Sequence, residues 1–206
     1  LFRLLEARPG LLEQLMAIVT LAPPLADDLA RRPALFDALI DRSAHDLPES
    51  VPALQRAMQR AEPRGNYEAL LDRIRVVTGE ARFALGVQLI SGTHDPLEIA
   101  HGFAVVAEAA LQTALAGTVA EFAKAHGTIE GSEMVILGLG RLGGEALTHA
   151  SDLDIIYLFT GDHGAESDGE RPLSATRYYN RLAQRVGAAL SVPTAEGPLY
   201  EVDTRL

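Results

Sequence analysis

The sequence predicts an α+β protein, in which an N-terminal helical region precedes a small mixed β-sheet core with flanking helices. Apolar residues recur at helical spacing through most of residues 1–126, two short apolar runs flank a glycine-rich turn, and residues 199–206 alternate polar with apolar side chains. With 206 residues, 48% of them hydrophobic, the chain can bury a substantial core. We therefore predict a helical region over residues 1–126 and a sheet-containing core over residues 127–206.

The first sixty residues predict short helices. Leu11, Leu12, Leu15 and Ile18 lie at helical spacing, and a proline pair then breaks the pattern. Residues 42–52 are polar and contain two prolines, which is typical of a loop between helices. Further short helices are expected over residues 25–31, 34–40 and 52–61.

Two long helices are predicted next. The first runs from Asn66 to about Gly92, and the second runs from Asp95 to about His126, with Pro96 in its first turn, where no backbone N–H is required. The apolar side of the first helix comprises Leu70, Leu71, Ile74, Val77, Ala81, Ala84, Leu85 and Leu89. Because amphipathic stripes ordinarily face a core, we expect both helices to be structural.

A glycine-rich turn follows the first predicted strand, Met134–Leu137. Gly138, Gly140 and Gly143 fit the G-x-G-x-x-G spacing of dinucleotide-binding proteins, in which a full helix must follow the third glycine. Only seven residues separate the last glycine of the turn from Asp152, and the next apolar run begins at once. Since a parallel crossover needs a longer connection, the spacing argues against a dinucleotide site.

Two aspartates open the second predicted strand, which continues to Phe159. Alternate side chains of a strand share a face, so Asp152 and Asp154 are expected side by side. Neighbouring carboxylates repel unless a cation lies between them, and hard oxygen ligands suit Mg²⁺, which completes its shell with water and substrate phosphates. Gly143 and Gly144 would let backbone N–H groups approach phosphates without a Cβ in the way. Together these residues predict a nucleoside triphosphate site.

A third carboxylate is predicted on the last strand. In residues 199–206 the alternation places Glu201, Asp203 and Arg205 on one face. Two aspartates on one strand and a third on a neighbouring strand can hold two metal ions, the arrangement used for in-line displacement at phosphorus. Alternatively, Asp203 is a polar residue on a solvated strand face.

An acidic, glycine-bearing loop over residues 160–173 connects the second strand to a further helix. A loop of this length is either a solvated connection or a flap that closes on a substrate. Ser174 is expected to cap the helix that follows, which has one apolar side. Arg181 and Arg185 fall outside that side, and by themselves they fit ordinary solvated charges.

These motifs occur together in one known family. In this order and spacing, GLGRLGG, SDLD, SDGERPL, YYNRLAQRV and LYEVDTRL resemble the glutamine synthetase adenylyltransferase family, whose nucleotidyltransferase domains are similar to the DNA polymerase β superfamily. The resemblance is tight over the last third of the chain and looser through the helices before it. It is closer to the C-terminal domain that adds AMP than to the domain that removes AMP.

The resemblance implies transfer of AMP from ATP to a tyrosine of glutamine synthetase by a two-metal reaction. It implies that Asp152, Asp154 and Asp203 are the catalytic residues and the ligands of Mg²⁺. The nucleotide-binding residues that it implies are Gly143, Gly144, Ser151, Arg181 and Arg185. The implied partners are glutamine synthetase and, through the full-length enzyme, a PII-type signal protein. It also implies that the nucleotidyltransferase core is truncated here at its C-terminal end.

Two positions depart from the family pattern, and two other functions stay open. Ala146 stands where the family has glutamate, and Arg141 stands where lysine is frequent. The same three carboxylates would also serve phosphorolytic removal of AMP from glutamine synthetase. Alternatively, the site is inactive and the chain is an interaction module.

The amino-acid composition limits which classes of partner and which cellular location are expected. A net charge of −10 and an isoelectric point near 5.0 provide no basic surface for a nucleic acid backbone, so we expect none as a partner. The absence of cysteine excludes disulfides and fits a cytoplasmic protein. No signal peptide is visible, and we expect that no apolar run approaches the length of a membrane span and that no membrane is a partner.

Overall fold

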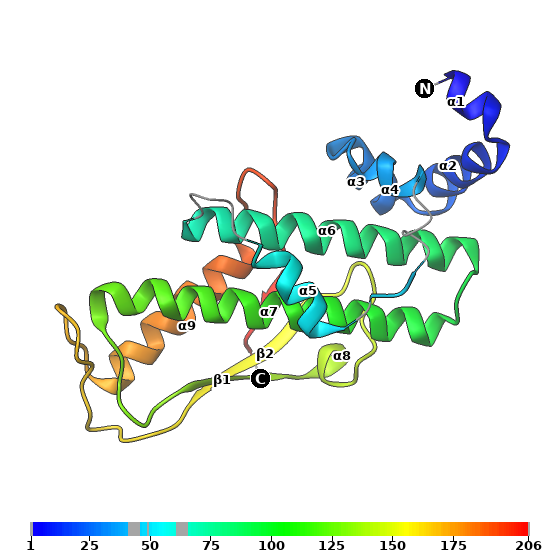
Figure 1. Ribbon diagram of the computed structural model, residues 1–206. Coiled ribbons are helices and arrows are strands. Elements are labelled where there is room, and N and C mark those ends of the chain that lie inside the picture. Colours follow the sequence, from blue (N-terminus) through cyan, green and yellow to red (C-terminus); the bar gives the residue numbers. More distant parts are fainter. Residues whose placement is uncertain (1, 41–45, 49, 61–65, 206) are drawn as a thin grey trace.

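The computed structural model confirms the α+β fold class, and it describes residues 2–40, 46–48, 50–60 and 66–205. Two long helices, α6 (Tyr67–Ser91) and α7 (Pro96–His126), lie side by side, and a three-stranded sheet and α9 (Ala175–Ser191) pack against α7 (Figure 1). α5 packs on both long helices, and the N-terminal helices gather on the side of α6 that faces away from the sheet. These shorter helices are α1 (Phe2–Ala7), α2 (Pro9–Leu21), α3 (Pro23–Arg31), α4 (Leu35–Ile40) and α5 (Val51–Met58).

Polar caps define the ends of the two long helices, close to where the sequence predicts them. The Asn66 side chain accepts a hydrogen bond from the Ala69 N–H at 2.9 Å, and the Asp95 side chain accepts one from the Leu97 N–H at 2.7 Å. Gly92 ends α6 in the left-handed conformation, with φ +61°. The predicted bounds of both helices are therefore confirmed.

The sheet has the order β1-β2-β3, with β1 (Met134–Gly138) antiparallel to β2 (Leu153–Phe159) and β2 parallel to β3 (Val202–Asp203). A short helix, α8 (Gly140–Gly143), occupies the glycine turn. The strand expected over residues 199–206 is shorter than predicted. Tyr200 is buried and its N–H donates to the carbonyl of Leu190 at 3.1 Å, so this part of the chain is held by α9 and not by a strand ladder.

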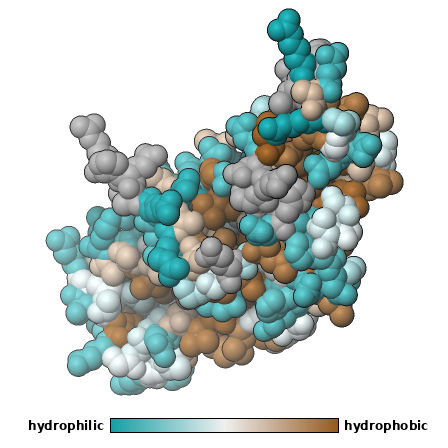
Figure 2. Space-filling view, turned by 45° about the vertical axis from the view of Figure 1, so that its right-hand side comes forward, coloured by the Kyte–Doolittle hydropathy of each residue, from teal (hydrophilic) through white to brown (hydrophobic). Residues whose placement is uncertain are grey.

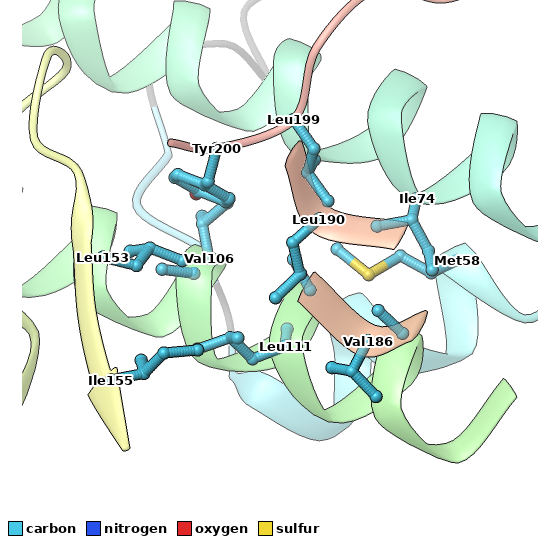
Figure 3. Packing of buried hydrophobic residues seen from close by; sticks show 14 of the residues in the cluster. Met58, Ile74, Val106, Leu111, Leu153, Ile155, Val186, Leu190, Leu199 and Tyr200 are labelled. Atoms are coloured by element: carbon cyan, nitrogen blue, oxygen red, sulfur yellow. The ribbon is translucent and has the colours of Figure 1, made fainter. Parts of the chain in front are cut away.

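The principal hydrophobic core lies between the helices and one face of the sheet. Figure 3 shows Leu153 and Ile155 of β2 turned toward Val106 and Leu111 of α7, and both strand residues are almost fully buried. This cluster draws residues from both sides of the predicted boundary at 126/127, which itself stays a prediction. A second, smaller cluster joins the N-terminal helices to α6 and contains Leu11, Ile18, Leu25, Leu35, Leu39, Phe83 and Val87.

Helix α2 carries apolar side chains on more than one face. Of the stripe predicted from its sequence, Leu11 and Ile18 are buried, but Leu12 is 45% exposed. Met16 and Val19 are also exposed, and Figure 2 shows hydrophobic surface at this N-terminal end of the molecule. Helical spacing alone therefore identifies α2 as a helix without identifying which side faces the core.

Helix α7 is the only single helix among the described residues that is long and apolar enough to cross a membrane. Its sequence contradicts the expectation that no apolar run has that length. Within the fold, 56% of the most apolar window is buried, because α6, α5 and α9 pack around it. This degree of burial is what the core helix of an α+β domain shows.

The loop before α9 is fastened to the end of α7. The N–H groups of Asp168 and Gly169 donate to the carbonyls of Thr128 and His126, both at 3.1 Å. The Asp168 carboxylate in turn accepts from the Thr128 N–H at 2.6 Å. Ser174 precedes the first residue of α9 as predicted, but its side chain makes no capping hydrogen bond. The part of the loop around Asp168 and Gly169 is thus held against the end of α7 by hydrogen bonds.

A buried arginine joins α6 to the end of α9. Arg75 is 1% exposed, and burial lowers the pKa of its guanidinium, which nevertheless stays protonated at neutral pH. Its three nitrogens donate to the carbonyls of Leu71, Ala189, Val192 and Gly197 at 2.7–3.0 Å. A cation at a helix C-terminus also interacts favourably with the helix dipole. The sequence prediction missed this residue.

Replacing Arg75 with Met should destabilise the protein by about 3 kcal/mol, because several carbonyls lose a charged donor inside the fold. For a chain of this size the melting temperature should fall by about 6 to 12 °C, measured by circular dichroism. Arg177→Met is the control, since Arg177 is exposed on α9 and should change stability by about 0.5 kcal/mol or less. Equal melting temperatures for the two variants would contradict the role of Arg75.

Candidate functional site

The glycine turn is built around the backbone and side chain of Asp154. The Leu139 N–H donates to the Asp154 carbonyl at 2.8 Å, which continues the β1–β2 ladder beyond Gly138. Gly140 has φ +51°, and a Cβ added there would lie 2.2 Å from Oδ2 of Asp154. A Cβ added at Gly143 would lie 2.5 Å from the Gly138 carbonyl oxygen. The turn therefore needs glycine where it approaches the carboxylate.

The amides of the glycine pair are used inside the turn. The Gly143 N–H donates to the Leu139 carbonyl at 2.8 Å, and the Gly144 N–H donates to the Gly140 carbonyl at 3.1 Å. In this structure these glycines allow close packing of the backbone within the turn. Their predicted contact with phosphates through backbone N–H groups stays a prediction.

Asp154 and Asp203 are neighbours across the parallel strands. The register pairs Leu153 with Val202 and Asp154 with Asp203, and the Leu153 N–H donates to the Glu201 carbonyl at 2.9 Å. Paired residues of adjacent strands share a face, so both aspartates lie opposite to the buried Leu153. The sequence predicted this shared face but could not establish the register.

Asp152 is exposed and lies immediately before β2, two residues from Asp154. A turn precedes it, in which the Ser151 hydroxyl accepts from the Thr148 N–H at 3.0 Å. The two hydroxyl oxygens of Ser151 and Thr148 are 2.8 Å apart. In this structure Ser151 thus shapes the chain that leads into Asp152, and its predicted contact with the nucleotide stays a prediction.

The Asp203 carboxylate is paired with Arg205. The guanidinium donates to both carboxylate oxygens at 3.0 and 2.9 Å, and the backbone N–H of Arg205 adds a third bond at 2.9 Å. These hydrogen bonds lower the pKa of Asp203 to about 2, so the side chain is ionised at neutral pH. Arg205 itself is largely exposed.

The donor set suits magnesium in its chemistry. Asp154 and Asp203 supply ionisable oxygen ligands in register on one face, with Asp152 close by in the chain. Over the part of the chain that the structure describes, no three histidine, cysteine or acidic side chains are grouped closely enough to hold an ion. Because the Arg205 guanidinium already donates to both oxygens of Asp203, an ion bound by this carboxylate would compete with Arg205.

The two arginines of α9 lie away from these carboxylates. Arg185 lies over the Phe122 ring at 5.2 Å from its centroid and faces α7, and Arg181 is exposed. Among the described residues, no hydrogen bond or ion pair joins either arginine to the aspartates. Their predicted contact with phosphates stays a prediction.

A cavity of about 490 Å³ lies between α7 and β1, behind the glycine turn. Ile136 and Gly138 line it, and Gly138 pairs with the buried Ile155, so the cavity is on the helix-covered face of the sheet. His101 Nδ1 lies 3.0 Å from Glu145 Oε2 at its edge. The aspartates belong to the other face and do not point into this cavity.

Sequence reasoning missed two residues, Arg82 and Asp28, that contact the segments carrying the aspartates. Arg82 of α6 donates to the carbonyls of Leu199 and His149. His149 Nε2 in turn lies 3.2 Å from Oδ2 of Asp28, which belongs to α3. Burial raises the pKa of Asp28, but the nearby His149 and two arginines outweigh this effect and lower it. The sequence did offer one signal for Arg82: it is a charged residue among the apolar residues of a long helix, so a structural partner could have been expected for it.

Comparison with known proteins agrees with these motifs. The sequence profile of the family described as glutamate-ammonia ligase adenylyltransferase matches residues 12–206. The chain is 43% identical to a Mesorhizobium japonicum protein named bifunctional glutamine synthetase adenylyltransferase/adenylyl-removing enzyme. Proteins of the same name from Brucella melitensis and Agrobacterium fabrum are 41% and 40% identical. Each match covers 100% of this chain but only 21% of the relative.

Gly140→Ala should destabilise the fold by about 2 kcal/mol, because a side chain is strained at positive φ and the new methyl group overlaps the Asp154 carboxylate. Urea unfolding followed by circular dichroism measures this change. Gly187→Ala is the control of opposite sign: it lies within α9, its added Cβ has room, and alanine should stabilise the helix by about 0.5 to 1 kcal/mol. Unchanged stability of Gly140→Ala would contradict the packing described for the turn.

Proposed function

Because the chain belongs to the glutamate-ammonia ligase adenylyltransferase family, we propose that it contributes the nucleotidyl-transfer site of an enzyme that moves AMP from ATP to a tyrosine of glutamine synthetase. The chain spans 21% of the length of the relatives cited above, so the activity of the whole enzyme is part of this proposal. Such a reaction would regulate nitrogen assimilation.

The observation that carries the proposal is the register of the two parallel strands. It brings Asp154 beside Asp203, although 48 residues lie between them in the chain. The glycine turn lies against the same Asp154. The Leu139 N–H donates to its carbonyl, and the absence of a side chain at Gly140 leaves room for its carboxylate. A carboxylate pair next to a tight glycine turn suits a magnesium-bound triphosphate, because this ion usually takes one or two protein carboxylates together with substrate phosphates.

Each residue of this chain has a definite task in the proposed reaction. Asp152, Asp154 and Asp203 would hold magnesium, which supplies positive charge to the phosphates and lowers the pKa of the attacking hydroxyl. Asp203 is already ionised at neutral pH, so it needs no proton loss before it binds a cation. The turn closed by Ser151 and Thr148 would orient Asp152, and the glycines would keep the space beside Asp154 open.

The direction of the reaction is a separate question. The names of the relatives include both the addition and the removal of AMP. Phosphorolysis would use the same carboxylates but would require inorganic phosphate and adenylylated protein in place of ATP. We favour the adding direction, because SDGER, RLAQR and YEVDTRL resemble the adding domain of the family.

The proposed partners follow from the reaction. Glutamine synthetase would be the acceptor protein, and a PII-type signal protein would act through the full-length enzyme. A net charge of −10 disfavours a nucleic acid acceptor. We also propose a cytoplasmic location, where ATP and glutamine synthetase are both present.

Titration calorimetry with ATP, in the presence and absence of Mg²⁺, tests the site. Asp154→Asn and Asp203→Asn should each weaken magnesium-dependent ATP binding by at least about tenfold, since a neutral amide is a poor ligand for this ion. Asp27→Asn on the exposed side of α3 is the control and should bind like the unsubstituted chain. Magnesium-independent binding of NAD would instead favour the dinucleotide interpretation, and binding of neither nucleotide would favour an inactive interaction module.

A further inference from the structure

β3 has little strand pairing of its own. Within the described residues, just Val202 and Asp203 pair with β2 in this strand, and parallel pairing is slightly less stable per residue than antiparallel pairing. Two residues of ladder are too few to determine where a strand lies. The position of Asp203 relative to Asp154 must therefore depend on contacts outside the sheet.

Arg82 of α6 supplies such contacts to both aspartate-bearing segments. Its Nη1 donates to the Leu199 carbonyl at 3.1 Å, four residues before Asp203, and its Nη2 donates to the carbonyl of His149, three residues before Asp152. One guanidinium thus bridges two segments that are 50 residues apart in the sequence.

The guanidinium has two further neighbours. Its central carbon lies 4.9 Å from the centroid of the Tyr200 ring, and Tyr200 is buried. The face of a neutral tyrosine ring attracts a cation, and burial raises the pKa of Tyr200 to about 12. Asp28 of α3 lies beside His149, the residue whose carbonyl Arg82 contacts, and it also interacts electrostatically with Arg82.

We propose that Arg82 is a positioning residue for nucleotidyl transfer, which sets the separation between the segment carrying Asp152 and the strand carrying Asp203. This inference rests on the proposed function. Arginine suits the task because its planar fork presents two donors in a fixed geometry, whereas the single ammonium of lysine is a point charge on a flexible stem. Arg82 contacts neither aspartate side chain, so it acts through the backbone that leads to each one.

The test compares Arg82→Lys with Arg82→Met and with the control Arg177→Lys on the exposed side of α9. Lysine keeps the positive charge beside Tyr200 but lacks the two guanidinium N–H groups that donate to the carbonyls of Leu199 and His149. We expect Arg82→Lys to stay folded, with magnesium-dependent ATP affinity at least about tenfold weaker by calorimetry, since misplaced ligands cannot share one ion. Mn²⁺ affinity, measured by electron paramagnetic resonance without nucleotide, should fall as well.

Hydrogen exchange provides a readout that needs no ligand. The Leu153 amide is protected by its bond to the Glu201 carbonyl, so it should exchange faster in Arg82→Lys, whereas the Val186 amide in α9 should be unchanged. A purely stabilising residue would alter both amides together.

The outcomes separate this inference from the proposed function. If the unsubstituted chain binds no magnesium and ATP, the proposed function and this inference both fail. If it binds but folded Arg82→Lys binds within twofold of it, only the inference fails. If Arg82→Lys and Arg82→Met are both unfolded, Arg82 serves folding and the positioning role is overturned.

Discussion

Arginine side chains that reach from the helical layer to backbone carbonyls determine where the last segment of this chain lies. A guanidinium inside a protein is tolerated only when its N–H groups are satisfied, and Arg75 meets that requirement with four carbonyls. Arg82 contacts the same segment about two helical turns further along α6, and Arg32 donates to the carbonyls of Arg75 and Glu196. Carbonyls lack the charge of a carboxylate, so these bonds fix backbone position without neutralising the arginines.

The glycine turn imposes a different constraint on the site. Gly140 leaves room for the Asp154 carboxylate, and the chain then passes through Glu145, which has φ +52° although it is not glycine. Non-glycine residues adopt this conformation only where the surroundings require it. Oε2 of Glu145 lies 3.0 Å from Nδ1 of His101 in α7, but both side chains are largely exposed, so this contact adds little stability. The turn is therefore held mainly by β2, through the backbone and side chain of Asp154.

Local sequence determines much of this fold. Asn66, Asp95 and Gly92 predict helix ends because capping depends on residues within one turn, and the alternation of buried and polar residues predicts the aspartate face of β2. Features that depend on distant partners were not predictable. The residues before β3 alternate like a strand, yet burial of Tyr200 against α9 interrupts the ladder.

The same reason explains what the sequence could not show about the site. Asp203 was identifiable as a carboxylate on a strand face, but its pairing with Arg205 depends on side-chain conformation. Arg75 lies among apolar residues of an amphipathic helix, where spacing alone predicts no function for it. Its role follows only from the four carbonyls that the fold places around it. Leu12, too, fits the helical stripe of α2 but is exposed, because only part of that stripe meets α6.

The hydrophobic core links the strand that carries Asp154 to the long helices. Leu153 and Ile155 alternate with Asp154 along β2, and they are buried in a cluster that includes Val106 and Leu111 of α7. A strand cannot shift its buried residues without shifting the residues between them, since the two sets share one backbone. The position of Asp154 therefore depends on the packing of β2 against α7 as well as on its pairing with β1, and the position of Asp203 depends on α6 and α9. The two long helices act as the frame on which the carboxylates are aligned.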